Sequence, residues 1–147
     1  MPANTTLAQD QDTLLKLWAA MGGAKQTLTN GSDDVSKWKG IRVSGGRVYS
    51  IDWRECKLPL SGVISKEIGN MRELTWLALY GNSLSGEIPK ELGNCTKLNI
   101  CYLHQNKLSG VIPKEIGNCT ALTTLRLDSN ELSGVLPPTI GNLKNVT

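Results

Sequence analysis

The segment Leu84–Leu98 reads LSGEIPKELGNCTKL, and the chain repeats it almost unchanged at Leu108–Leu122 as LSGVIPKEIGNCTAL. The two copies begin twenty-four residues apart and differ at only three positions. A fixed period of this length is typical of proteins built from stacked structural repeats. We therefore expect the period, more than any single motif, to determine the fold.

Three aligned units follow one another at 74–97, 98–121 and 122–145, after a less regular first unit at 48–73. Each aligned unit reads L-x-x-L-x-L-x-x-N-x-L-S-G-x-I/L-P-x-x-I/L-G-N, with Cys101 in place of one leucine. The alternation of leucines predicts a short strand with one buried face, and the asparagine that follows suits a turn. Stacked units can pair their strands about 4.8 Å apart in a parallel sheet over a shared core.

The asparagines of this motif should stack as well, because they recur at positions 82, 106 and 130. An amide side chain carries both donors and an acceptor, so it can satisfy the backbone of the turn in which it lies. Cys56 takes the place of the asparagine in the first unit.

The run N-x-L-S-G-x-I-P resembles the plant-type leucine-rich repeat, and the resemblance covers roughly residues 47–147. It implies the fold class of the leucine-rich-repeat solenoid. This fold is a right-handed superhelix with a parallel β-sheet on its concave side and short 3₁₀ or extended segments on its convex side.

Residues 1–45 are interpreted as an N-terminal tail and cap, with a helix at about 6–21, a loop and the start of a β-hairpin. The helix is predicted from apolar residues at helical spacing, followed by Gly22-Gly23 as a stop: Leu7, Leu14, Leu17, Trp18 and Met21. Residues 46–147 then hold about four repeats with no C-terminal cap. Because repeat arrays need caps for solubility, we expect either a longer parent chain or an end covered by a partner or a second copy.

The stretch from Ser36 to Val43 resembles the cap motif C-x-W-x-G-V-x-C of plant-type repeat proteins, with Trp38 and Gly40 in place and both cysteines absent. In this respect the chain is similar to disulfide-free leucine-rich repeat proteins of protists, algae and bacteria. The missing disulfide and the lack of a signal peptide favour the cytoplasm. Secretion is the alternative if an upstream signal was removed.

The four cysteines fall on repeat positions that otherwise hold apolar residues, which predicts buried thiols and no metal site or cofactor. Five Asn-x-Ser/Thr sites occur, and Asn30 in the cap loop is the best candidate for glycosylation. Asn94 and Asn118 are expected instead to bind the backbone of the convex turns. Mixed charges argue against nucleic-acid binding, and the longest apolar run is far too short to span a membrane.

Specificity in a solenoid has to lie in its variable positions, and those on the concave strands include a group of large aromatic residues. Such residues are enriched at binding hot spots. The alternative is that aromatic side chains merely pack on one another on any exposed sheet. The predicted ligand-binding residues are Arg54, Trp76, Tyr80, Ile100, Tyr102, His104, Arg126 and Asp128.

Catalysis is not expected. His104 should neighbour Asp128, with Ser129 beside it, but no oxyanion pocket is evident and an open sheet does not exclude water. The sequence favours a non-catalytic module that recognises a protein or peptide. The alternative is the recognition portion of a larger leucine-rich repeat receptor or receptor kinase, whose ligand could be a glycan.

Overall fold

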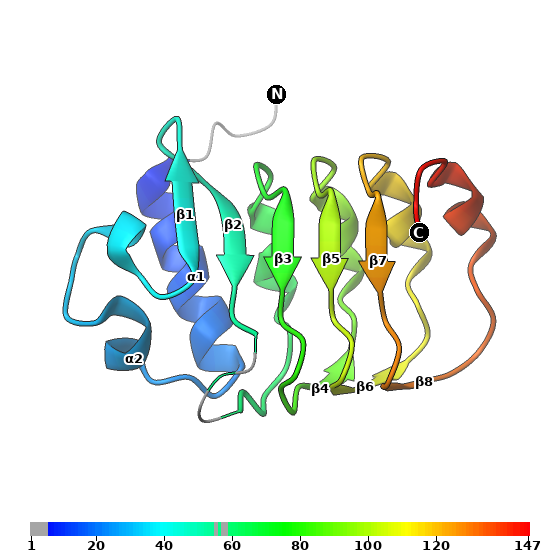
Figure 1. Ribbon diagram of the computed structural model, residues 1–147, viewed down its shortest axis with the longest axis horizontal. Coiled ribbons are helices and arrows are strands. Elements are labelled where there is room, and N and C mark those ends of the chain that lie inside the picture. The colour runs from blue at the N-terminus through cyan, green and yellow to red at the C-terminus, as the bar shows by residue number, and fades with distance from the viewer. Residues whose placement is uncertain (1–5, 55, 57–58) are drawn as a thin grey trace.

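The computed structural model describes residues 6–54, 56 and 59–147. The residues outside it fall in the predicted N-terminal tail and first repeat. The described chain forms an elongated coil with a five-stranded sheet along one side and a row of short helices behind it (Figure 1). No helix among the described residues is both long and apolar enough to cross a membrane.

The main sheet has the order β1-β2-β3-β5-β7. Its first pair is an antiparallel hairpin, and every later pair is parallel. Neighbouring repeats meet in the register that the twenty-four-residue period requires, with Leu77 opposite Cys101 and Cys101 opposite Leu125. The strands are β1 (Ile41–Ser44), β2 (Arg47–Asp52), β3 (Trp76–Ala78), β5 (Ile100–Tyr102) and β7 (Thr124–Arg126).

The remainder of each coil adds two features. A 3₁₀ helix follows each proline or serine turn, as the convex side was predicted to show: η2 (Lys66–Asn70), η3 (Lys90–Asn94), η4 (Lys114–Asn118) and η5 (Pro138–Asn142). The Leu-Ser-Gly segments form a second parallel sheet that the sequence did not predict: β4 (Ser85–Glu87), β6 (Lys107–Gly110) and β8 (Glu131–Leu132). These segments are short and polar, and they lack the alternation of apolar residues that predicts a strand.

The stacked asparagines connect successive coils. Asn106 donates from Nδ2 to the carbonyls of Leu79 and Leu103 at 3.0 and 3.1 Å, and its Oδ1 accepts from the N–H of Leu84 at 3.0 Å. Asn82 and Asn130 repeat this pattern. The prediction that the amide satisfies its own turn is confirmed, and the same amide also binds the preceding coil. Cys56 retains one such contact, from its Sγ to the carbonyl of Trp53 at 3.4 Å.

The N-terminal cap begins with α1 (Leu7–Ala20), which Thr6 and Gln9 start with a reciprocal capping box. The stretch predicted as a loop contains two short helices, α2 (Lys25–Thr29) and η1 (Val35–Lys37). The hairpin turn falls at Gly45-Gly46, where both residues have positive φ. Asn30, the predicted glycan acceptor, is exposed at the end of α2.

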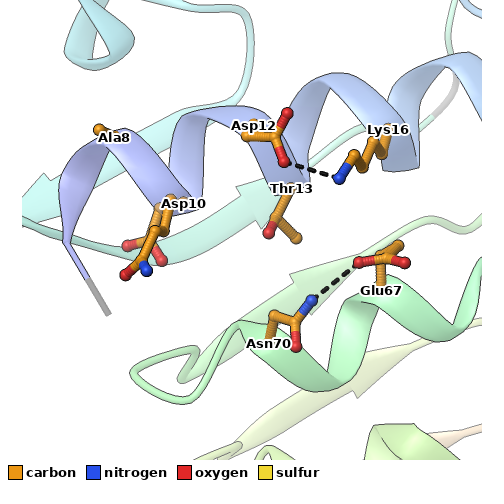
Figure 2. A pocket seen from close by; sticks show the side chains of 8 residues that line it. Ala8, Asp10, Asp12, Thr13, Lys16, Glu67 and Asn70 are labelled. Atoms are coloured by element: carbon orange, nitrogen blue, oxygen red, sulfur yellow. Dashed lines mark hydrogen bonds and ion pairs between the residues drawn. The ribbon is translucent and has the colours of Figure 1, made fainter. Parts of the chain in front are cut away.

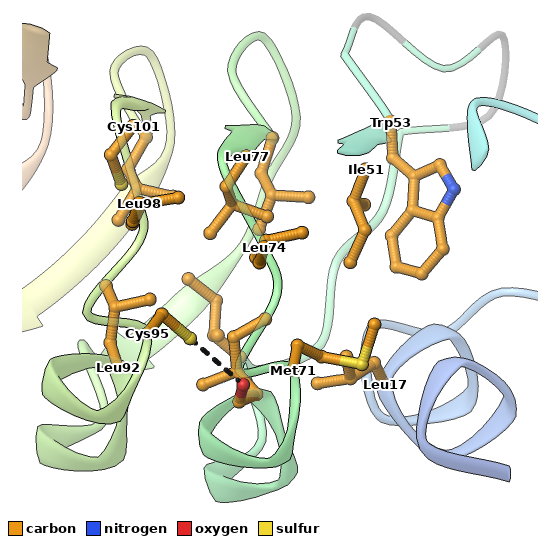
Figure 3. Close-up of a cluster of buried hydrophobic side chains, with 14 of the residues drawn as sticks. Leu17, Ile51, Trp53, Met71, Leu74, Leu77, Leu92, Cys95, Leu98 and Cys101 are labelled. Carbon is orange, nitrogen blue, oxygen red and sulfur yellow. Dashed lines mark hydrogen bonds between the residues drawn. The ribbon is translucent and has the colours of Figure 1, made fainter. Parts of the chain in front are cut away.

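The core is continuous from the cap through the repeats. Figure 3 shows Leu17 of α1, Ile51 and Trp53 of the first repeat, and Leu74 and Leu77 of the next in one buried cluster. Trp18 meets Trp53 edge to face at 4.8 Å, which joins the cap to the solenoid. Because the leucines of each coil pack against those of the next, the apolar interior is continuous between the cap and the repeats.

All four cysteines are free and buried, so the prediction of core thiols is confirmed. Burial raises the pKa of Cys95 to about 12 and that of Cys119 to about 11. The expectation for Asn94 and Asn118 is wrong. Their side chains are exposed, and within the described part of the chain they make no hydrogen bond to the convex backbone. Carbonyls of the 3₁₀ turns are already bonded within each turn, as Leu92 is to Cys95.

Candidate functional site

The concave face carries a group of rings held by the strand register. Tyr80 and His104 lie one repeat apart just beyond β3 and β5, so the strand spacing places one ring over the other. Their centroids are 4.5 Å apart with the planes only 14° from parallel. The imidazole of His104 is consequently buried, with 6% of the residue exposed.

Tyr102 completes the group. It lies opposite Ala78 in the sheet, and this small neighbour leaves room for the phenol ring between two larger ones. The ring of Tyr102 meets Trp76 at 5.7 Å and 90°, Tyr80 at 6.0 Å and 83°, and His104 at 5.8 Å and 90°. Edge-to-face contacts of this kind are favourable beyond the area that they bury. The four rings, here called the aromatic cluster (Trp76, Tyr80, Tyr102 and His104), are therefore mutually fixed.

Two arginine–aspartate pairs flank the aromatic cluster. On the cap side, Arg54 Nε lies 3.1 Å from Asp52, while its Nη1 donates to the Tyr80 hydroxyl at 3.1 Å. On the other side, Arg126 holds Asp128 through two hydrogen bonds of 3.0 and 2.8 Å. The hydrogen bonds from Arg126 lower the pKa of Asp128 below its ordinary value. Each guanidinium therefore has a carboxylate beside it.

His104 neighbours Asp128 as predicted, but the two side chains share no hydrogen bond among the described residues. The carboxylate of Asp128 accepts two short hydrogen bonds from Arg126, and the imidazole of His104 stacks on the ring of Tyr80. Burial, followed by the nearby charge of Arg126, lowers the pKa of His104, and Asp128 only partly opposes this shift. The buried Nδ1 of His104 has no hydrogen-bond partner among the described residues. Among the described residues, no carboxylate therefore accepts a hydrogen bond from the imidazole.

An open depression of about 390 Å³ lies over the aromatic cluster. Six of the eight predicted binding residues line it: Arg54, Trp76, Tyr80, Tyr102, His104 and Arg126. Of the other two, Asp128 accepts a hydrogen bond from Arg126, which lines the depression, and Ile100 lies opposite Trp76 in the sheet. The period of the repeat thus brings together residues that are up to 72 positions apart in the sequence.

Trp76 differs from the other three tryptophans. The indole N–H groups of Trp18, Trp38 and Trp53 each donate to a backbone carbonyl at 2.8–2.9 Å, and all three residues are buried. Trp76 is only partly buried, and its indole N–H has no acceptor among the described residues. A large ring with an unused donor on an open face is available to a ligand.

A second hollow of about 360 Å³ adjoins the first on the cap side. It shares Arg54 and Trp76 with the depression over the aromatic cluster and adds Arg42, Tyr49 and Thr75 to its walls. Sequence reasoning missed this hollow, because Arg42 belongs to the hairpin of the cap, which follows no repeat frame. Trp76 stands between the two hollows.

A further hollow of about 460 Å³ lies between α1 and η2 on the convex side (Figure 2). Two pairs of its polar side chains bind each other, Lys16 with Asp12 at 2.8 Å and Asn70 with Glu67 at 2.8 Å. The described residues contain no group of three or more histidine, cysteine or acidic side chains arranged for a metal ion. The concave face therefore remains the candidate site.

Comparison with known proteins agrees with this fold. The family model described as Leucine Rich Repeat matches residues 73–95, 97–119 and 121–143. No curated protein matches the chain.

Solved structures of plant receptor ectodomains are similar along most of the chain. The ectodomain of the receptor kinase SOBIR1 from Arabidopsis thaliana is 28% identical, with a TM-score of 0.81 over 95% of this chain and 76% of that one. The ectodomain of GASSHO1/SCHENGEN3 from Arabidopsis thaliana, in complex with CASPARIAN STRIP INTEGRITY FACTOR 2, is 32% identical with a TM-score of 0.79, over 92% of this chain and 17% of that one. The plant peptide hormone receptor RGFR1 in complex with RGF2 is 41% identical with a TM-score of 0.67, over 75% of this chain and 20% of that one.

The fold and its concave face define a repeat solenoid of the kind used for ligand recognition. The chain has the leucine-rich-repeat solenoid fold, and the family model together with the receptor ectodomains supports a plant-type leucine-rich repeat family. It spans about a fifth or less of two of these receptor structures and about three quarters of the third. The narrower similarity to disulfide-free proteins of protists, algae and bacteria stays a prediction.

Proposed function

We propose that the protein is a non-catalytic recognition module that binds a protein or peptide across its concave sheet. The observation that carries the proposal is the aromatic cluster, which is fixed by its own ring contacts and open on one side. Aromatic side chains that are already ordered lose little entropy on binding and give large contact areas. The similarity to receptor ectodomains, one of them the plant peptide hormone receptor RGFR1 in complex with RGF2, supports the same function.

Affinity purification from native extract tests this proposal. A Trp76→Ala/Tyr102→Ala double variant should lose the partner that the wild type retains, by about 30-fold or more in affinity if these rings are hot spots. The matched control is Lys90→Ala/Lys114→Ala, which alters two exposed residues of the convex helices and should retain the partner. Equal retention by both double variants would exclude the concave face.

The alternative is that the chain is the recognition portion of a larger receptor or receptor kinase, with a glycan as a possible ligand. The chain matches only 17% and 20% of two longer receptor structures, and this partial match supports the alternative. Aromatic faces also stack on sugar rings, so the same aromatic cluster could serve. Sequencing the complete transcript distinguishes a larger receptor, and a glycan array with the Trp76→Ala variant as control distinguishes the ligand.

We also propose self-association through the C-terminal end of the solenoid, where apolar side chains are exposed. Val135 is 85% exposed and Leu136 66%, whereas Val111 in the preceding coil is partly covered by Gly134. Sedimentation velocity over a range of concentrations should show a dimer for the wild type and a monomer for Val135→Lys/Leu136→Lys. A wild type that stays monomeric throughout excludes this interface.

A further inference from the structure

We infer that the hollow between the cap and the aromatic cluster binds a carboxylate group of the peptide ligand. The inference rests on the proposed function and specifies the chemistry at one end of the ligand. Three features of this hollow carry it: a row of side-chain donors without partners, one cation without a carboxylate, and its position next to the aromatic cluster.

The strand register brings the three donors into one row. Arg42 of β1 lies opposite Ser50 of β2, and Ser50 lies opposite Trp76 of β3. The three strands are side by side in the main sheet (Figure 1), and residues directly opposite one another share a face of the sheet. All three residues line the hollow of about 360 Å³. The short serine between two long side chains leaves the space that the hollow occupies.

The donors in this row have no acceptor within the described part of the chain. Ser50 is only 6% exposed, yet its hydroxyl makes no hydrogen bond to another described residue. The indole N–H of Trp76 and the exposed guanidinium of Arg42 likewise contact no described acceptor. A buried polar side chain normally has a hydrogen-bond partner. A ligand group that accepts several hydrogen bonds would supply partners for this row.

The charges of the hollow select an anion with a single charge. Its lining contains two arginines and one aspartate, and Asp52 lies 3.1 Å from the Nε of Arg54. Arg42 has no carboxylate beside it among the described residues. A carboxylate carries one negative charge and can accept two parallel hydrogen bonds from a guanidinium. A phosphate ester carries about −1.5 to −2 at pH 7, which exceeds the charge of Arg42 and would be repelled by Asp52.

The position of the hollow sets the direction of the ligand. The hollow shares Arg54 and Trp76 with the depression over the aromatic cluster. A peptide that packs an apolar side chain on the aromatic cluster can therefore place a neighbouring carboxylate beside Arg42. This group can be an aspartate or glutamate side chain or the C-terminus of the peptide, since both present the same two oxygens.

Panning two random peptide libraries on the wild type tests the inference and distinguishes these sources. One library has a free C-terminus, and the other has its C-terminus fused to the phage coat protein. Acidic residues enriched in the fused library indicate a side chain, and enrichment from the free library alone indicates the terminal carboxylate. Fused peptides enriched without any acidic residue would overturn the inference and leave peptide recognition standing. If no enriched peptide depends on Trp76 and Tyr102, both proposals fail.

Isothermal titration of an enriched peptide and of its amide analogue completes a double-mutant cycle with Arg42→Gln. We expect Arg42→Gln to raise the Kd of the acidic peptide about fivefold or more, as for a charge-assisted hydrogen bond, and to leave that of the amide unchanged. Ser50→Ala should raise the Kd of the acidic peptide about two- to tenfold. The matched control, Arg72→Gln, alters an exposed arginine that lines neither hollow and should change nothing.

Two results of this titration would contradict the inference. One is an equal loss of affinity of the acidic and amide peptides for Arg42→Gln, because the guanidinium would then not contact the carboxylate. The other is tighter binding of a peptide in which phosphoserine replaces the acidic residue, because the hollow would then select a phosphate.

Discussion

Asn106 shows what a single residue contributes to this solenoid. Its amide makes hydrogen bonds to the backbone of its own coil and of the preceding one, and it is 8% exposed. The apolar residues of a coil fix how far it lies from its neighbour, and the asparagine fixes the register of the turn. A residue without both donor and acceptor would leave buried backbone groups unsatisfied, which costs about 1–3 kcal/mol each.

His104 should make stability depend on pH. Its pKa is lowered in the folded protein by burial and then by Arg126, against the opposing charge of Asp128; Tyr80 and Tyr102 are its ring neighbours. Because the unfolded imidazole has its ordinary pKa near 6.5, its contribution to stability is present above about pH 6.5. It is lost as the pH falls through the lower folded value.

Urea unfolding at pH 7.5 and pH 5.5 measures this contribution. The free energy of unfolding of the wild type should fall more between these pH values than that of His104→Phe, which retains a ring against Tyr80 and cannot be protonated. The two proteins should be close in stability at pH 7.5. An identical fall in both would show that the imidazole is not the group responsible.

The 3₁₀ helices pack through a column of glycines. A side chain added at Gly93 would bring its Cβ to within 2.4 Å of the carbonyl oxygen of Glu115 in the next coil, whereas Gly141 in the last coil has open space around it. The glycine therefore sets how closely η3 and η4 approach. The repeat motif contains this information, because glycine recurs at the same place in every coil.

Gly93→Ala should destabilise the protein by about 1–3 kcal/mol, the usual cost of overpacking. Gly141→Ala is the matched control in the same motif position. It should be neutral or stabilise by about 0.4–1 kcal/mol, because alanine lowers the entropy of the unfolded chain without a clash. Thermal unfolding of both variants measures the difference, and equal effects would refute the close approach of η3 and η4.

At the scale of the whole molecule, the cap is fastened to the repeats by one buried ion pair. Asp10 of α1 is 1% exposed and accepts from Arg47 at 2.9 and 3.1 Å and from the N–H of Val48 at 2.9 Å. These bonds join the first helix to the strand that begins the solenoid. The repeat frame does not predict this contact, because Arg47 lies 37 residues from Asp10 in the sequence.

Asp10→Ala should lower the free energy of unfolding by about 2–4 kcal/mol. Removing one partner of a fully buried pair costs about 3–5 kcal/mol, and the Arg47 side chain, which is 17% exposed, can recover some hydration. Asp12→Ala is the control, since Asp12 lies on the same helix in an exposed pair with Lys16 and its loss should leave the unfolding midpoint unchanged. Chemical denaturation that gave both variants the same midpoint would contradict this role of Asp10.

Much of the site could be predicted because the repeat frame assigns each residue a face. Trp76, Tyr80 and Tyr102 were placed on the concave side from their frame positions alone, and the register of β3 and β5 agrees. The partner of His104 could not be predicted in this way. Asp128 lies near both Arg126 and His104, and the choice between them depends on side-chain geometry that no spacing encodes.

The sequence by itself determined the solenoid, because leucine, asparagine and glycine recur with the period of one coil and each coil can bury its apolar edge only on the next. The tertiary structure alone decided the second sheet, the lack of an acceptor for the Trp76 indole N–H among the described residues, and the hollow that the cap adds beside it. These features arise where side chains from different coils, or from cap and repeat, meet at contact distance. A repeating pattern specifies which residues are neighbours, and only the folded chain specifies which of their atoms bond.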